Sequence, residues 1–405
     1  DLPAVGAGER ETVALPVDGD SLAGGDGSNP DGEHVLTVEA SLSGDRAWAE
    51  AGHTVATGQF DLPIGGGPET VTPAAGSALS VERDGAELVV SNADSRVVFD
   101  VVRGRLDSLS YRGTELVTDG PDVGLWRAPT DNDNGLPLPR RLLSTVVEYV
   151  ESGDPVDPQA TWAIGFADLW REYGLDSLDF HCDNVGVTER AGETESVEVS
   201  VSGRLAPPIY DHGFAVEQTF TVRPTGAVDV DVTLEPEGEL STLPSLPRVG
   251  LDLELAGDAD DVTWYGRGPG ESYVDSKESS LLGRYDGRVS DLHTPYVRPQ
   301  ENGNRTDTRW VRFTDGHTGL EVTADAPFDF SAHHYTTADL ESTAHDAELP
   351  ERAPVFLSVD HAHCGLGTGS CGPPTLEQYR LSPQETYEFS VTLTPFVVDG
   401  QSVGR

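Results

Sequence analysis

The chain has 405 residues, enough for two or three domains or for one very large β domain. It carries 70 aspartate and glutamate residues against 26 lysine and arginine residues, so its formal net charge is −44. That sign argues against nucleic acid and against anionic membranes as partners. Only one basic residue is a lysine, Lys277, and the acids are dispersed. This pattern favours the surface of a halophile's protein, suited to molar salt, over an acidic patch for a basic partner.

Cysteine usage and the first residues bear on location. Three cysteines, Cys182, Cys364 and Cys371, are an odd and low number for a secreted disulfide scaffold, which favours a reducing, cytoplasmic environment. No apolar run reaches the length of a membrane span. The chain starts at Asp1 and contains no methionine, so we expect a fragment, a processed subunit or an excised segment.

Residues 1–63 indicate a small amount of β structure. The runs Val13–Pro16, Val35–Ala40 and Gln59–Leu62 alternate apolar and polar residues. These are too few strands for an independent sandwich, so we expect the trailing part of an immunoglobulin-like β domain. Residues 64–77 are rich in glycine and proline and are expected to be a linker.

Residues 78–400 are dominated by period-two alternation, which is typical of strands. Strands are predicted at Leu79–Arg83, Glu87–Ser91, Arg96–Val101, Leu106–Tyr111, Thr114–Thr118, Val197–Val201, Phe214–Arg223, Val228–Leu234, Trp310–Thr314, Leu320–Ala324, Phe356–Asp360 and Tyr387–Thr394. A short helix is predicted at Pro139–Glu151, and Arg140–Tyr173 is the least regular part, expected to be a long surface excursion. About fifteen or more strands predict an all-β fold, a large antiparallel sandwich.

The stretch Leu125–Gly135 (Leu-Trp-Arg-Ala-Pro-Thr-Asp-Asn-Asp-Asn-Gly) runs from an apolar strand end into a polar turn. Pro129 lacks a backbone donor, so a strand should stop there, and Gly135 supplies a free φ. A tryptophan beside four carboxylate and amide side chains suits a carbohydrate, which needs an aromatic face and planar hydrogen-bonding groups. On residue types alone, the stretch also fits a hydrogen-bonded turn beside a core tryptophan.

Five stretches in order resemble signatures of the carboxyl-terminal domain of glycoside hydrolase family 2 β-galactosidases. They are Leu125–Gly135, Tyr265–Asp275, Thr294–Gly303, Phe328–Tyr335 and Val359–Pro373. Upstream, Ala47–Gly52 resembles the end of the preceding immunoglobulin-like domain. The resemblance covers nearly the whole chain but only the back end of the family's polypeptide. Together with the acidic composition, it suggests a haloarchaeal-type enzyme.

The resemblance implies a fold and a division of labour. The family's carboxyl-terminal domain is an antiparallel supersandwich related to the galactose mutarotase fold, here expected over residues 78–400. The family's catalytic glutamates and its magnesium and sodium ligands lie in an upstream (β/α)8 barrel, and no alternating βα pattern is present here. We therefore expect no catalytic residue, no metal and no cofactor in this chain. Expected partners are the upstream barrel polypeptide, a β-galactoside substrate and further copies of the full enzyme.

The resemblance also suggests substrate-binding residues. The glycine that matches Gly135 is the hinge of a loop at the family's active-site mouth; a fixed surface loop is the alternative. The candidates are Trp126, Asp131, Asn132, Asp133, Gly135, His363 and Cys371. Cys371 stands where well-studied members have a sugar-stacking tryptophan, so a stacking platform is missing there unless Trp126 or Tyr379 compensates. His363 equally fits a buried structural histidine.

Other polar groups allow further interpretations. His361, His363, Cys364 and Cys371 are soft ligands, but on a strand His361 and His363 would face one way and Cys364 the other, and the spacing matches no closed zinc site. The stretch around Arg267 and Glu271 is expected to form rigid, hydrogen-bonded turns, in which an ion pair such as Arg267–Glu271 is conceivable.

Two alternative functions stay open. One is a stand-alone carbohydrate-binding module. The other is an aldose mutarotase, whose chemistry needs a facing acid and base. His212, His293 and His333 are available for it, but no mutarotase signature surrounds them.

The charge predicts salt dependence. Because unscreened acids repel one another, the chain should unfold when salt falls well below molar. Circular dichroism of the chain dialysed from about 3 M to about 0.1 M KCl would follow this loss. An unchanged melting temperature across that range would contradict the halophile interpretation.

Overall fold

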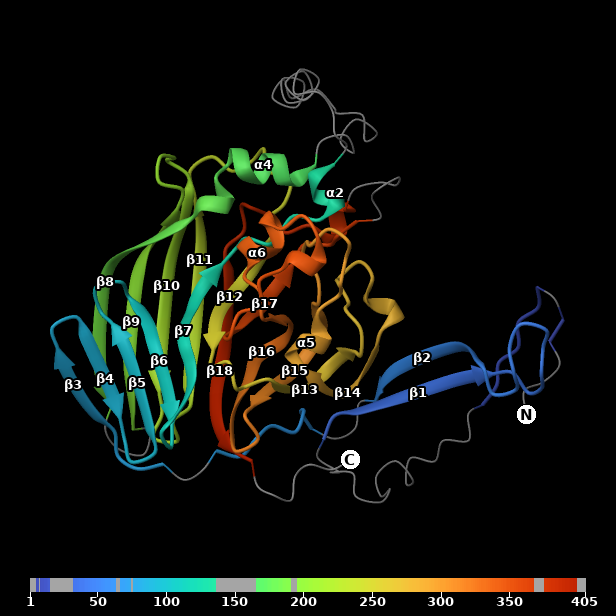
Figure 1. Cartoon of the computed structure of the whole chain (residues 1–405), viewed down its shortest axis with the longest axis horizontal. Coiled ribbons are helices and arrows are strands. Elements are labelled where there is room, and N and C mark those ends of the chain that lie inside the picture. The colour runs from blue at the N-terminus through green and yellow to red at the C-terminus, as the bar shows by residue number, and fades with distance from the viewer. Residues whose placement is uncertain are drawn as a thin grey trace. The chain divides into compact units, whose positions relative to one another are not determined.

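Figure 1 shows the computed structural model of the chain, which describes residues 5–6, 8–14, 32–62, 66–73, 76–135, 165–190, 195–367 and 375–398. The chain divides into two compact units, Asp1–Glu69 and Thr70–Arg405. Two sequence predictions, the helix at Pro139–Glu151 and the role of Cys371, fall outside the described residues.

The first unit contains an antiparallel pair of strands, β1 (His34–Ser41) and β2 (Thr54–Leu62). Two of the three runs predicted in this part, Val35–Ala40 and Gln59–Leu62, are confirmed as strands. The third run is not, because Val13 and Ala14 lie outside any strand and the rest of it is not described. Phe60 is 58% exposed within this unit, so the pair presents an apolar side chain that a complete sandwich would bury.

The second unit is one sixteen-stranded antiparallel sheet. Its main path runs β3-β4-β5-β6-β7-β12-β17-β16-β18-β11-β10-β9-β8, and β15 joins β16 to β13, which in turn pairs with β14. The strands are β3 (Ser80–Asp84), β4 (Glu87–Ser91), β5 (Ser95–Asp100), β6 (Arg105–Tyr111), β7 (Thr114–Gly124), β8 (Asp179–Arg190), β9 (Ser196–Ala206), β10 (Gly213–Val222), β11 (Val228–Glu237), β12 (Arg248–Leu255), β13 (Asp261–Gly268), β14 (Leu281–Arg288), β15 (Arg305–Thr314), β16 (Thr318–His333), β17 (Val355–His363) and β18 (Tyr387–Val397).

Helices are short in the described residues. They are α2 (Asp131–Asn134), α4 (Phe166–Glu172), α5 (Val289–Leu292) and α6 (Thr337–Ser342), with single 3-10 turns at Leu175–Ser177, Lys277–Ser279, Asp346–Glu348 and Glu377–Tyr379. The predicted all-β antiparallel fold is confirmed.

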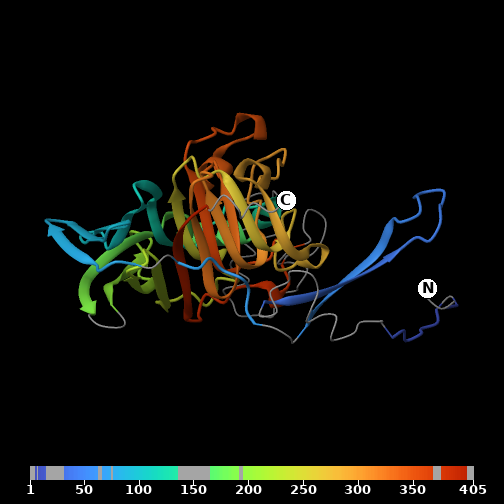
Figure 2. The same ribbon diagram turned by 90° about the horizontal axis from the view of Figure 1, so that it is seen from below.

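The sheet curls until its two ends face each other. Strands β3–β7 and β8–β11 form two layers (Figure 1, Figure 2). The rings of Phe99 on β5 and Phe220 on β10 meet between these layers, with centroids 5.4 Å apart. Both side chains are fully buried, as are Trp264 on β13 and Phe330 on β16. Burial of such rings supplies the main stabilisation of the sandwich.

Every strand predicted in residues 78–400 lies within an observed strand or within one residue of it. Four observed strands were not predicted, namely β8, β12, β13 and β14. Glycine or inward charged residues, such as Arg248 and Gly250, break their alternation. Helix α4 was also missed, since its seven residues lie in the stretch predicted to be irregular; it buries Phe166 and Trp170.

Candidate functional site

The motif 125–135 forms a one-turn helix at one end of the sandwich. Thr130 caps α2, its side chain accepts from the backbone N–H of Asp133, and the Asp133 carboxylate accepts from the Thr130 backbone. Gly135 follows with φ 64°, a backbone conformation that favours glycine. Strand β7 ends at Gly124, five residues before Pro129, so the predicted strand end was wrong. The carbonyl groups of Trp126 and Ala128 accept instead from Arg248 Nε and from the backbone N–H of Glu301.

Arg127 and Asp133 form a buried ion pair inside this turn. Arg127 Nη2 lies 2.7 Å from Asp133 Oδ1, and Nε lies 3.2 Å from Oδ2. The two residues are 1% and 3% exposed. Burial lowers the pKa of Arg127, but the attraction of Asp133 outweighs it and the net pKa is raised, so the guanidinium keeps its charge. A bidentate geometry of this kind fixes the turn in one orientation.

Arg127 also joins the turn to the segment 364–367. Its Nη1 donates to the carbonyl of Cys364 at 2.6 Å. Beside it, Asn132 Nδ2 donates to the carbonyl of Leu366 at 2.9 Å, and the backbone N–H of Gly367 donates to Asp275 at 2.6 Å. Three motifs that are far apart in the sequence therefore meet at one edge.

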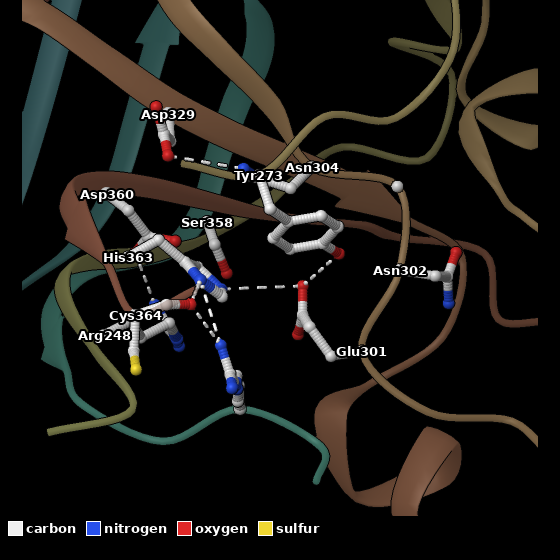
Figure 3. Close-up of polar contacts among 12 residues, drawn as sticks. Arg248, Tyr273, Glu301, Asn302, Asn304, Asp329, Ser358, Asp360, His363 and Cys364 are labelled. Carbon is white, nitrogen blue, oxygen red and sulfur yellow. Dashed lines mark hydrogen bonds and ion pairs between the residues drawn. The ribbon is translucent and has the colours of Figure 1, made fainter. Parts of the chain in front are cut away.

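His363 adjoins this edge, and Figure 3 shows its ring near Glu301 and Cys364. Its Nδ1 is 3.1 Å from Arg127 Nη1, which can only donate, and 2.9 Å from the carbonyl oxygen of Cys364, which can only accept, so the two contacts favour opposite tautomers of the ring. Its Nε2 is 3.8 Å from Glu301 Oε1, which accepts from the Tyr273 hydroxyl at 3.2 Å. Burial, aided by Arg127, lowers the pKa of His363 well below its usual value, so the ring is neutral. Burial raises the pKa of Glu301 to about 7.

A second buried network adjoins the first. Arg248 donates to Asp360 at 2.8 Å and to both oxygens of Asp252 at 2.6 and 2.8 Å. Burial raises the pKa of Asp360 to about 6 despite this partner. Neither Arg127 nor Arg248 was among the predicted site residues. Charged residues at inward positions of apolar strands, such as Arg248 and Asp360, were the signal that could have identified the second network.

The predicted site residues differ in accessibility. Asp131 is exposed, and Gly135, Asn132 and Trp126 are partly buried. Trp126 Nε1 donates to Glu341 at 3.2 Å, and its ring meets the buried Trp170 edge-on. Asp133 and His363 are buried, with their polar atoms directed at Arg127. Cys371 lies outside the described residues. Contact of any of these residues with a sugar stays a prediction.

Two predictions about neighbouring residues were wrong. His361 is exposed whereas His363 is buried, because the β12–β17 register shifts between Val249 and Gly250 and inserts His361 as an extra residue. Arg267 lies on β13 and pairs with Asp307 rather than with Glu271.

Glu271 instead accepts from Thr294, Tyr296 and the backbone of Gly303. No group of three potential ligands that could hold a metal occurs in the described part of the chain. No described helix is long and apolar enough to cross a membrane.

Comparisons with known proteins agree along most of the chain. The family model described as "Beta galactosidase small chain" matches residues 91–393, and "Beta-galactosidase, domain 4" matches residues 1–63. A β-galactosidase of Priestia megaterium is 32% identical, covering 91% of this chain and 32% of its own length. One from Kluyveromyces lactis is 30% identical, covering 87% of this chain and 32% of its own length. The chain spans about a third of the length of the curated relatives it matches.

Solved structures with a similar course of the chain include a galactose mutarotase-like protein of Clostridium acetobutylicum, with a TM-score of 0.41 and 9% identity over 79% of this chain and 99% of that chain. A GalM/aldose epimerase homologue from C. elegans has a TM-score of 0.41 and 12% identity over 80% of this chain and 100% of that chain.

The buried ion pair allows a direct test. Asp133→Asn leaves the Arg127 guanidinium buried without a counter-charge, so the free energy of unfolding should fall by about 3–5 kcal/mol. Denaturant unfolding at high salt measures this. Glu87→Gln is the matched control, because its pair with Arg96 is about half exposed and should contribute less than about 1 kcal/mol. Equal small effects of both variants would contradict the anchoring role.

Glu301 predicts a pH dependence of stability. Its pKa is raised from 4.5 to about 7 in the folded state, so the folded state holds its proton more tightly. The resulting stabilisation is present below pH 4.5 and is lost as the pH rises through about 7. Glu301→Gln imitates the protonated form, so its stability relative to the natural chain should rise between about pH 5 and about pH 8. Denaturant unfolding at both pH values tests this; a flat or falling difference contradicts it.

Proposed function

Because the chain belongs to the β-galactosidase small-chain family, we propose that it forms the carboxyl-terminal part, or a separate small subunit, of an enzyme that hydrolyses terminal β-galactosides. The match over residues 91–393 is the observation that carries the proposal. Relatives named β-galactosidase align with most of this chain and extend well beyond it. The activity itself therefore belongs to a larger assembly in this proposal.

Within that assembly, the role of this chain is structural rather than catalytic. Retaining glycoside hydrolysis needs two carboxyl groups about 5–5.5 Å apart, one free to attack and one free to donate a proton. The buried carboxylates Asp133 and Asp360 are each held by an arginine in an ion pair. This arrangement supports a chain that is inactive alone and that depends on an upstream catalytic barrel.

The edge formed by α2 and residues 364–367 is the proposed contribution to the substrate site. It presents the exposed Asp131 and the turn at Gly135, and the buried Arg127 holds both segments in place. A rigid edge of this kind positions substrate groups without taking part in bond breaking. Sugar contacts by Trp126 and by Cys371 remain part of the proposal.

Further features of the whole enzyme follow as proposals. The net charge of −44 with a single lysine supports a halophilic, haloarchaeal-type origin. The unpaired cysteines Cys182 and Cys364 support a cytoplasmic location. We place the metal ions of the enzyme in the upstream barrel and expect the full enzyme to be a homo-oligomer.

Replacing the residues that follow α2 tests the role of the edge formed by α2 and residues 364–367. An ideal Cβ on Gly165 would lie 2.0 Å from the carbonyl oxygen of Asp133 and 2.5 Å from the Gly135 nitrogen, so the described residues Gly135 and Gly165, which flank residues 136–164, lie close together. Replacing residues 136–164 with a short glycine-serine link, to give a spliced chain, should keep the sandwich folded. Mixed with the upstream polypeptide in about 2–3 M salt, the spliced chain should support at least about 10²-fold less hydrolysis of a chromogenic β-galactoside.

The controls separate folding from function. Replacing residues 191–194, between the paired strands β8 and β9, with Asn-Gly should leave activity unchanged. The natural chain without the upstream polypeptide should show no hydrolysis. Hydrolysis by the chain alone would overturn the division of labour, and full activity of the spliced chain would overturn the role of the α2 edge.

A further inference from the structure

A pocket of about 330 Å³ opens on one face of the sheet, bounded by β7, β12, β16 and β17 and by α6. Three of these strands are adjacent in the sheet, in the order β7, β12 and β17. Asp252 on β12 lies opposite both Asp122 on β7 and Ser358 on β17, and Glu254 lies opposite Phe356. Because side chains two apart on a strand share a face, these pairs form a polar grid on the pocket wall.

Carboxylate acceptors dominate the grid, and the hydroxyl of Ser358 within it already donates to Asp252. Carboxylates of Asp122, Asp252, Glu254 and Asp360 line the pocket, together with the guanidinium of Arg248; Asp122 is also 3.5 Å from Arg105, which lies outside the lining. The donors of Arg248 are already used, on the carbonyl of Trp126, on Asp360 and on Asp252. Figure 3 shows Arg248, Asp360 and Ser358 in this region. A ligand must therefore bring its own hydroxyl donors, and an anionic ligand would be repelled.

Apolar surface completes the pocket. The rings of Phe356 and Tyr335 are partly exposed and line it, together with Leu340 from α6. A partly exposed aromatic ring beside carboxylate acceptors matches a ligand with one C–H face and a rim of hydroxyl groups. The volume lies at the lower end of the range of about 300–1,000 Å³ for ligand pockets, which suits one sugar ring rather than a chain of them.

We propose that this pocket binds a neutral monosaccharide, a hexose in its ring form, through hydroxyl donation to the carboxylate grid and stacking on Phe356. All the residues named are on this chain, so the inference does not depend on the proposed galactosidase activity. Sugar binding can be measured on the chain alone. The result is therefore independent of whether mixing with the upstream polypeptide restores hydrolysis.

Isothermal titration calorimetry of the full chain in molar salt is the first measurement. D-galactose and D-glucose should bind saturably, with dissociation constants on the order of 1 mM. Galactose 6-phosphate and galacturonate should bind at least about tenfold more weakly, because the wall is acidic. Absence of binding to the folded chain up to about 100 mM of either neutral sugar would overturn the proposal, as would binding of galactosamine or a simple amine without binding of the neutral sugars.

Variants locate the binding. Ala338 on α6 is exposed and lines the pocket, so Ala338→Trp should fill it without disturbing the core and should abolish binding. Ala344→Trp, at an exposed position outside the pocket, is the matched control and should bind as the natural chain does. Phe356→Leu keeps an apolar side chain but loses the ring, so affinity should fall about tenfold. Unchanged affinity in Ala338→Trp would place the sugar elsewhere and refute the assignment.

Discussion

A single buried guanidinium constrains one end of this molecule. Removing an arginine from water costs several kcal/mol unless its donors are satisfied, and Arg127 achieves this with Asp133 and the carbonyl of Cys364. These partners come from the turn that follows β7 and from the end of β17. Their relative position is therefore set by one side chain in addition to the strand ladder, and the edge of the sandwich has little freedom to vary.

Pairing of buried arginines with carboxylates also explains how this very acidic chain accommodates charged groups in its interior. Arg127 and Arg248 each meet carboxylates through a planar fork, which a lysine could not reproduce. Positive and negative groups are matched in the interior, so the excess of acid is left to the surface. The match is incomplete at Glu301 and Asp360, whose pKa values are raised to about 7 and about 6 by burial. Ionising them near neutral pH costs stability, which is the consequence of placing carboxylates where water is excluded.

The sequence was sufficient for the fold class but not for the networks. Strands β9–β11 were predictable because one face packs in the core and the other meets water, which gives strict alternation. Strand β12 was not, since Arg248 and Asp252 interrupt that alternation. The motifs around Asp133 and His363 were recognised from their order in the chain. That Arg127 connects them could not be derived, because 70 acids offer no rule for choosing the partner of one arginine.

Arg248 connects the two surfaces to which we assign roles. Its Nε donates to the carbonyl of Trp126, next to the α2 turn, while its two other nitrogens bond Asp360 and Asp252 on the pocket wall. A ligand that draws Asp252 toward its own hydroxyl groups competes directly with one of these bonds. Arg248 thus links the proposed sugar pocket to the α2 edge through one planar side chain, and an ammonium group, with its compact and rotatable donors, could not span the same three directions.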